Sequence, residues 1–180
     1  ALLLAACATQ STSPSPVEGV HFRMIDTNGI KLRVAEAGKG PLVVLVHGWP
    51  ESWYSWRHQI PAIAAAGYHV IAPDMRGYGK SDKPAAVADY DINHTTGDIV
   101  GLLDALGEEK AIVIGHDWGA IVAWNTALLH PNRVSAMIAM SVPYGGRAAA
   151  APLASMKAAY GDNFYYILYH QEPGVAEAEY

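Results

Sequence analysis

The chain has 180 residues, with 12 Lys and Arg against 17 Asp and Glu, and a formal net charge of −5 at pH 7. Hydrophobic residues make up 51% and charged residues 16% of the chain, which excludes a disordered protein and supplies a core for one domain. The acidic balance leaves no basic face, so we expect no nucleic-acid partner. The single cysteine can form neither an internal disulfide nor a zinc cluster.

Residues 1–17 have the composition of an export signal followed by a tether. The segment LAAC at 4–7 resembles the bacterial lipobox, in which Cys7 becomes the lipidated first residue and anchors the protein to a membrane. Two alternatives stay open: ACA at 6–8 is also an A-x-A cleavage site that would discard the cysteine, and the pattern could arise by chance in a fragment. The polar, Pro-rich residues 9–16 suit a spacer. We therefore expect an exported protein, either periplasmic or a membrane-anchored lipoprotein.

Two strands are expected next, over residues 20–25 and 30–35, because apolar and polar residues alternate there. Asn28-Gly29 between them predicts a hairpin turn, since both residue types accept a positive φ. Residues 42–48 begin with consecutive apolar residues, which indicates a strand buried on both faces and hence a parallel sheet.

Strands and helices then alternate to residue 140. Further strands are expected over 68–72, 111–114 and 134–140. Helical spacing of apolar residues predicts helices over Trp53–Ile63 (with a kink at Pro61), Thr95–Leu106 (with Gly107 as its C-terminal cap) and Trp118–Leu129. This order predicts an α/β fold with a mostly parallel sheet.

The pattern changes after Pro143. Residues 145–160 are rich in Ala, and residues 163–180 contain four Tyr. We expect an insertion between sheet elements rather than another strand–helix unit. The predicted organisation is thus a signal and tether over 1–17, an α/β core over 18–143 and an inserted segment over 144–180.

The sequence GHDWG, residues 115–119, joins a predicted buried strand to a predicted helix. In that position a G-x-nucleophile-x-G turn is the nucleophile elbow of α/β-hydrolases, and it makes Asp117 the candidate nucleophile. The alternative is that Asp117 only caps the helix. Trp118 places its backbone N–H at the helix N-terminus, where it can stabilise negative charge.

An aspartate at the elbow narrows the chemistry. Its carboxylate is ionised at pH 7 and needs no general base for a first attack. Attack on an sp³ carbon that bears a leaving group gives a stable ester, which favours an epoxide or an alkyl halide as substrate. Hydrolysis of that ester then needs an oxyanion hole and a base. Residues 47–50 (HGWP) leave a buried strand where the second oxyanion donor should lie, as the backbone N–H of Trp49; the alternative is an ordinary turn, and we expect His47 to be structural.

Four segments together resemble the soluble epoxide hydrolases of the α/β-hydrolase superfamily: HGWPESWYSWR at 47–57, DMRGYGKSD at 74–82, GHDWGA at 115–120 and FYYILYHQEPGVAEAE at 164–179. The resemblance implies an α/β-hydrolase fold with a helical cap that begins near Pro143. It also implies Asp117 as the nucleophile and the backbone N–H groups of Trp49 and Trp118 as oxyanion-hole donors.

The resemblance further implies that a cap tyrosine protonates the epoxide oxygen, and motif registration places this role at Tyr166. Tyr165 and Tyr169 are its rivals and otherwise line the substrate pocket with Trp118. The family's catalytic His and acid would lie beyond residue 180, so the match covers the N-terminal portion only. We expect a core truncated before its last strands and a chain that is inactive by itself.

Three functions stay open. The favoured one is an exported epoxide hydrolase that opens a lipophilic epoxide to a vicinal diol through an ester on Asp117, with water as the only co-substrate and no metal or organic cofactor. The alternative is a haloalkane dehalogenase that uses the same nucleophile, with the Trp118 indole on the halide. The third is a non-catalytic surface lipoprotein on a hydrolase scaffold.

Overall fold

The computed structural model describes residues 13–146 and 150–179. The predicted lipidation site Cys7 and its signal lie outside the described residues. The chain divides into two compact units, Ala1–Pro143 and Tyr144–Tyr180.

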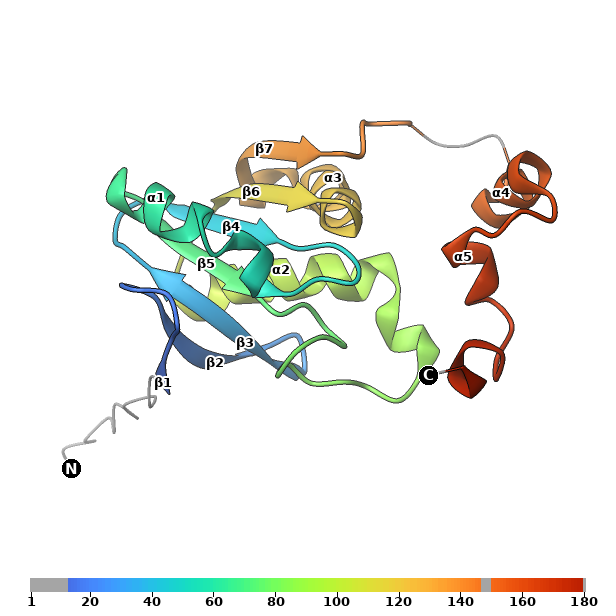
Figure 1. The fold of residues 1–180 in the computed structure, drawn as a ribbon. Helices are drawn as coiled ribbons and strands as arrows, with labels where there is room; N and C mark the ends of the chain where they lie inside the picture. The colour runs from blue at the N-terminus through green and yellow to red at the C-terminus, as the bar shows by residue number, and fades with distance from the viewer. Residues whose placement is uncertain (1–12, 147–149, 180) are drawn as a thin grey trace, which may run out of the picture. The chain divides into compact units, whose positions relative to one another are not determined.

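The first unit is built on one seven-stranded sheet with the strand order β1-β2-β3-β5-β4-β6-β7 (Figure 1). Its strands are β1 (Ser13–Pro14), β2 (His21–Thr27), β3 (Ile30–Ala37), β4 (Leu42–Val46), β5 (His69–Pro73), β6 (Ala111–His116) and β7 (Val134–Met140). The strands from β1 to β3 pair antiparallel, as do β3 and β5, whereas β5, β4, β6 and β7 run parallel. The parallel half brings the carboxyl ends of β4 and β6 to one edge of the sheet, with Val46 opposite Gly115.

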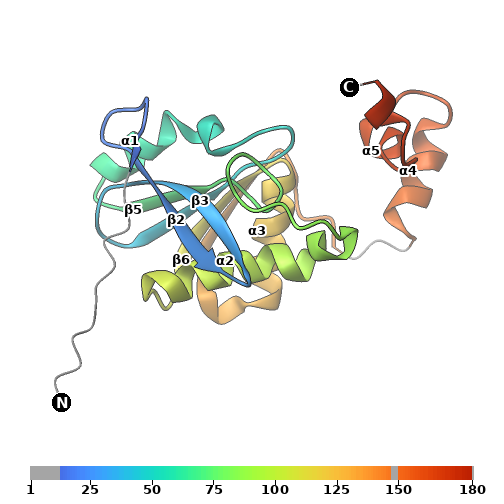
Figure 2. The ribbon, with the colours of Figure 1, turned by 90° about the horizontal axis from the view of Figure 1, so that it is seen from below.

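Helices cover both faces of this sheet, as the view from below shows (Figure 2). The 3₁₀ helix η1 (Trp53–Trp56) and α1 (Gln59–Ala65) pack on one face, where Trp53, Trp56 and Ile60 are buried against β4 and β5. The helices α2 (Ile92–Leu106) and α3 (Trp118–Leu129) pack on the other face. Short 3₁₀ helices, η2 (Val87–Tyr90) and η3 (Pro131–Arg133), precede α2 and follow α3.

All five residues of β4 are buried because apolar side chains alternate between two separate cores. Val44 and Val46 pack toward α2 and α3, whereas Val43 and Leu45 pack toward η1 and α1. This arrangement confirms the predicted α/β fold, and it explains why the strand lacks the polar alternation of β2.

Most predicted elements appear, with three corrections. The hairpin turn is confirmed, with φ of 46° at Asn28 and 79° at Gly29. The strand expected over 42–48 ends at Val46. The helix expected from Thr95 begins at Ile92 instead. The Asp91 carboxylate accepts a hydrogen bond from the backbone N–H of His94 (2.9 Å) and so caps the helix N-terminus.

The third correction concerns the helix expected over Trp53–Ile63 with a kink at Pro61. The segment is instead two helices, η1 and α1, separated at Arg57 and His58. Pro61 is the third residue of α1, within the first turn, where a backbone N–H has no acceptor inside the helix. The proline therefore removes no helical hydrogen bond.

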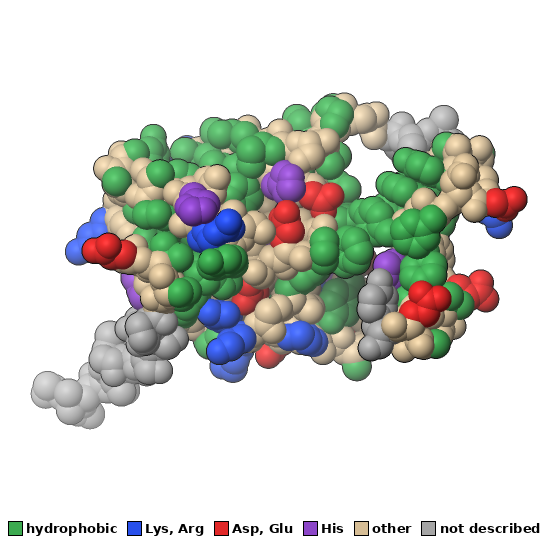
Figure 3. All heavy atoms as spheres, viewed as in Figure 1, with side chains coloured by type: hydrophobic (Ala, Val, Ile, Leu, Met, Phe, Trp, Pro, Cys, Tyr) green, Lys and Arg blue, Asp and Glu red, His purple; other side chains and the backbone are tan. Residues whose placement is uncertain are grey.

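The second unit is described over residues 144–146 and 150–179, and its regular elements are short helices. It contains α4 (Pro152–Tyr160), α5 (Tyr166–Tyr169) and η4 (Ala176–Ala178). The rings of Tyr160 and Tyr165 stack with centroids 4.0 Å apart. Apolar side chains make up much of the visible surface of this unit (Figure 3), and Phe164 is 76% exposed. Within the described parts of both units, no helix is long and apolar enough to span a membrane.

Candidate active site

The turn between β6 and α3 holds its central residue in an unusual backbone conformation. Asp117 has φ of 54° and ψ of −123°, between the last residue of the strand and the first residue of the helix. A Cβ at Gly115 would overlap the carbonyl oxygen of Gly119, and one at Gly119 would overlap that of Val46. The two glycines therefore let strand and helix approach closely enough to form the sharp turn expected of a nucleophile elbow.

The loop after β4 contacts the Asp117 carboxylate directly. The backbone N–H of Trp49 donates to Asp117 Oδ1 at 2.8 Å. A side chain at Gly48 would occupy the space that the Asp117 carboxylate fills. The Trp49–Pro50 peptide bond is cis. The structure thus brings Trp49 and Asp117 together.

His47 holds this loop in place through two contacts with the backbone. Its side chain is buried, with Nδ1 2.8 Å from the carbonyl oxygen of Gly48 and Nε2 2.9 Å from the backbone N–H of Met75. Burial lowers the pKa of His47. A neutral ring that donates from Nδ1 and accepts at Nε2 satisfies both contacts, which agrees with the structural role expected for this histidine.

Glu51 and His116 form a contact that sequence reasoning missed. The Glu51 carboxylate accepts the backbone N–H of Gly48 at 3.0 Å, and Glu51 Oε1 lies 3.3 Å from His116 Nδ1. Glu51 therefore links the loop that carries Trp49 to His116, the residue that precedes Asp117. The two residues are 65 positions apart, and no spacing rule connects them.

The loop over residues 74–82 is held by buried polar contacts. Arg76 pairs with the fully buried Asp98 at 2.6 Å, and this hydrogen bond raises the pKa of Arg76. Ser81 Oγ donates to the carbonyl oxygen of Asp74. These contacts fix the loop beside His47. The charge of Arg76 is paired with that of Asp98 and not directed at a ligand.

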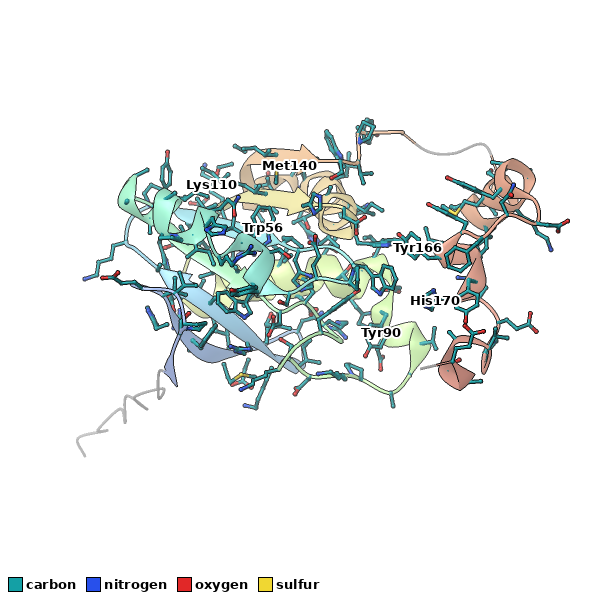
Figure 4. All side chains as sticks on the ribbon, viewed as in Figure 1. Trp56, Tyr90, Lys110, Met140, Tyr166 and His170 are labelled. Atoms are coloured by element: carbon teal, nitrogen blue, oxygen red, sulfur yellow. The ribbon has the colours of Figure 1, made fainter. Side chains whose placement is uncertain are left out.

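Two cavities lie near the contact between Gly48 and the turn that holds Asp117. The larger one, about 490 Å³, is bordered by Gly48 and Trp118 and is walled mainly by apolar groups of α2 and α3. The smaller one, about 220 Å³, is lined by Glu51 and His116 together with Trp56 and Met140, which are labelled in Figure 4. The larger cavity suits an apolar ligand, and the smaller one is more polar.

The three tyrosines of the sequence hypothesis all lie in the second unit. Tyr166 is the first residue of α5 and Tyr165 is its N-terminal cap residue. Tyr169 Oη donates to Glu179 Oε2 at 2.6 Å. The roles assigned to them stay predictions. Over residues 13–146 and 150–179, no group of three or more His, Cys, Asp or Glu side chains could hold a metal ion.

A family profile described as alpha/beta hydrolase fold matches residues 41–168, and the chain belongs to this family. Relatives of the chain include curated proteins named epoxide hydrolases. The chain is 58% identical to Epoxide hydrolase A of Mycobacterium tuberculosis over 159 residues, which are 87% of this chain and 49% of the relative. It is 48% identical to Epoxide hydrolase 3 of Siraitia grosvenorii over 165 residues, 91% of this chain and 52% of the relative.

Solved structures of epoxide hydrolases are also similar to this chain. The crystal structure of Epoxide Hydrolase A from Mycobacterium thermoresistibile superposes with a TM-score of 0.86 at 58% identity, covering 89% of this chain and 51% of that one. For epoxide hydrolase VrEH1 from Vigna radiata the TM-score is 0.87 at 47% identity, with 92% and 54% covered. These matches confirm the resemblance found in the motifs. The chain spans about half the length of the curated relatives it matches.

Proposed function

We propose that the protein to which this chain belongs is an epoxide hydrolase, with Asp117 as its covalent nucleophile. The observation that carries the proposal is the 2.8 Å hydrogen bond from the Trp49 backbone N–H to Asp117 Oδ1, at an elbow whose central residue is an aspartate. The names of the relatives support the choice of an epoxide over an alkyl halide.

The geometry predicts different roles for the two carboxylate oxygens of Asp117. Because Oδ1 is held by Trp49, Oδ2 attacks an epoxide carbon, the C–O bond of the ring breaks, and an alkyl ester forms on Asp117. The alkoxide that develops needs a proton. The resemblance assigns this donor role to the phenol of Tyr166, with Tyr165 and Tyr169 lining the pocket.

Hydrolysis of the ester then regenerates the enzyme. Water attacks Cγ of Asp117, negative charge moves onto Oδ1, and the bond from Cγ to the ester oxygen breaks to release a vicinal diol. The Trp49 N–H already points at Oδ1, and the Trp118 N–H at the start of α3 is the second proposed donor. The base that activates the water is expected beyond residue 180.

A competition assay tests this function. The protein expressed from the complete reading frame that contains this chain is incubated with a lipophilic epoxide and a bromoalkane, and diol and bromide are quantified. We expect diol from the wild type and none from Asp117→Asn, because Asn replaces the anionic oxygen with an amide while tolerating a positive φ. Bromide without diol would assign the protein to the haloalkane dehalogenases. If the protein formed no diol and no bromide, the result would favour a non-catalytic binding protein.

Export and lipidation at Cys7 are also proposals, and they rest on the first 17 residues alone. Intact-mass analysis of the protein from membrane and periplasmic fractions tests them. A diacylglyceryl adduct at Cys7 supports the anchor. A chain that begins after Cys7 supports a plain cleaved signal, and an intact cytoplasmic chain contradicts export.

A further inference from the structure

The peptide unit that joins Gly48 to Trp49 is held at both of its polar ends. Its N–H donates to Asp117 Oδ1 at 2.8 Å, and its carbonyl oxygen, which belongs to Gly48, lies 2.8 Å from His47 Nδ1. The same oxygen accepts the backbone N–H of Glu51 at 3.2 Å. In a trans peptide the N–H and the C=O point in opposite directions within one plane. The direction of the Trp49 N–H therefore depends on where His47 and Glu51 hold the carbonyl oxygen.

His47 is itself held by the loop over residues 74–82. The backbone N–H of Met75 donates to His47 Nε2 at 2.9 Å, and the ring of Tyr78 packs edge-on against the imidazole with centroids 4.9 Å apart. Because the Met75 N–H is a donor, Nε2 accepts, and the proton of the neutral ring lies on Nδ1, facing the Gly48 carbonyl oxygen. A displacement of Met75 would therefore release the ring that holds this carbonyl.

Arg76, the residue after Met75, is bound by groups from two other elements. Its Nε donates to Asp98 Oδ2 at 2.9 Å and its Nη2 donates to Asp98 Oδ1 at 2.6 Å, so the ion pair is bidentate. Its Nη1 donates to the carbonyl oxygen of Asp89 in η2. Asp98 lies on α2 and is fully buried, and Arg76 is 4% exposed. Because a buried charge without its partner is strongly unfavourable, this pair fixes the backbone beside Met75 to α2.

Asp98 also joins α2 to the hairpin of β2 and β3. Its Oδ1 accepts a hydrogen bond from Asn28 Nδ2 at 3.0 Å, and its backbone carbonyl oxygen accepts one from Thr27 Oγ1 at 3.0 Å. Helix and hairpin approach so closely that a Cβ at Gly97 would overlap Asn28 and one at Gly101 would overlap Thr27. The Asp98 carboxylate is therefore fixed relative to the sheet, and the loop over residues 74–82 is tied to it.

We propose that Asp98 is a positioning residue that, through its ion pair with Arg76, sets the direction of the Trp49 N–H toward the nucleophile. The inference rests on the proposed function, in which this N–H stabilises negative charge on Oδ1 of Asp117 while water attacks the ester. Asp98 acts through other groups of the protein and not on the substrate itself. Hydrolysis of the ester is therefore the step that depends on Asp98, because an oxyanion develops in that step and not when the ester forms.

Separate measurement of the two chemical steps tests the proposal in the protein from the complete reading frame. With enzyme in excess over a lipophilic epoxide, rapid quenching and intact-mass analysis give the rates at which the ester on Asp117 forms and disappears. Asp98→Asn keeps an oxygen acceptor for Arg76 but removes the charge. In this variant ester hydrolysis should be at least about tenfold slower, and ester formation should stay within about threefold of the wild type. The ester should therefore accumulate.

Two other variants of α2 separate positioning from damage to the fold. Asp104→Asn removes an ion pair with Arg133 at 2.6 Å, and Leu102→Ala removes a fully buried side chain of the core. A smaller folded fraction lowers both rates in proportion, so the ratio of the two rates should stay within about twofold of the wild type in each control. Thermal melting of every variant reports its stability. Equal losses in both steps of Asp98→Asn, or unchanged rates, would overturn the proposal.

A double variant tests whether Asp98 acts through Arg76. Arg76→Met should also slow ester hydrolysis more than ester formation. If both residues belong to one route, the double variant Asp98→Asn with Arg76→Met should hydrolyse the ester no more than about twofold more slowly than the slower single variant. Losses that multiply in the double variant would show that Asp98 acts by another route and would overturn the proposal.

A measurement without turnover keeps this inference separate from the proposed function. If the wild type forms no ester on Asp117, the proposed function fails, and NMR of the protein labelled with ¹⁵N-tryptophan then decides the positioning role. Trp49→Phe identifies the Trp49 amide resonance. Exchange of this amide proton with solvent should be at least about tenfold faster in Asp98→Asn and within about twofold of the wild type in Asp104→Asn. Equal exchange rates in Asp98→Asn and the wild type would overturn the proposal.

Discussion

The backbone N–H of Trp49 and the carboxylate of Asp117 meet at 2.8 Å although the two residues are 68 positions apart in the chain. They meet because β4 and β6 are parallel neighbours whose carboxyl ends reach the same edge of the sheet. One strand delivers a backbone donor and the other delivers a carboxylate. This contact makes the two oxygens of Asp117 inequivalent before any substrate is present.

The first prediction concerns the close approach of strand and helix at the elbow. Gly119→Ala should lower the free energy of unfolding by at least about 3 kcal/mol, because the added Cβ would overlap the carbonyl oxygen of Val46 and the backbone must move. Gly145→Ala is the control, since a Cβ there meets no heavy atom within 4 Å. Urea denaturation of both variants checks this, and equal stability of the two would contradict it.

The second prediction concerns Glu51. Glu51→Ala removes the acceptor for the Gly48 N–H, so the loop that aims the Trp49 N–H at Asp117 loses its anchor. Steady-state kinetics should show kcat at least about tenfold lower with a smaller change in KM, because the donor matters most in the transition state. Glu51→Gln keeps an oxygen acceptor and should recover part of the loss.

Glu109→Ala, at an exposed position, serves as the matched control for that series. If Glu51→Ala raised KM and left kcat unchanged, Glu51 would be contributing to substrate binding instead of positioning the loop.

The third prediction is a pH dependence of stability that originates at His47. Burial lowers the pKa of His47 below its ordinary value of 6.5, so the unfolded chain takes up this proton at a higher pH than the folded protein does. The stabilisation is therefore complete above pH 6.5 and is lost as the pH falls below it, by up to about 1.4 kcal/mol per pH unit.

Comparison of wild type with His47→Asn isolates this effect. The difference in their free energies of unfolding should shrink between pH 7.5 and pH 5, because the variant has no imidazole to protonate. A difference that stays constant over this range would mean that His47 is not held neutral by its contacts with Gly48 and Met75.

The fourth prediction separates the three tyrosines. Tyr166→Phe should reduce diol formation at least about 100-fold, since the developing alkoxide would lose the proton donor proposed for it. Any turnover of a bromoalkane should persist, because bromide leaves without a proton. Tyr165→Phe and Tyr169→Phe are matched controls and should have smaller effects. A uniform loss across all three variants would point to a pocket wall with no single donor.

Local sequence signals correctly predicted the strand and turns that position the site. The uninterrupted apolar run of β4, the turn at Asn28 and Gly29, and the elbow from Gly115 to Gly119 each depend on neighbouring residues, and each is present in the structure. Gly107 ends α2 with a φ of 73°, as expected of a C-terminal cap. Errors arose where one capping or breaking residue decides a boundary, as at Asp91 and Pro61.

The contacts that tune the site were not predictable in this way. The link from Glu51 to His116 depends on the pairing of β4 with β6 and on the loop path after Val46, and neither partner has a distinctive sequence context. The apolar cavity likewise forms between the starts of α2 and α3, at Ile92 and Trp118, which are 26 positions apart in sequence. Such features emerge only when the elements are packed together.

A single turnover in H₂¹⁸O tests the central claim, the covalent ester on Asp117, most directly. With enzyme in excess over a lipophilic epoxide, Oδ2 of Asp117 leaves with the product and water oxygen enters the carboxylate. The first diol formed should therefore carry no ¹⁸O, and the peptide that contains Asp117 should gain one ¹⁸O by mass spectrometry. A first-turnover diol that carries ¹⁸O, with Asp117 unlabelled, would show that water attacks the epoxide directly and that Asp117 is not the nucleophile.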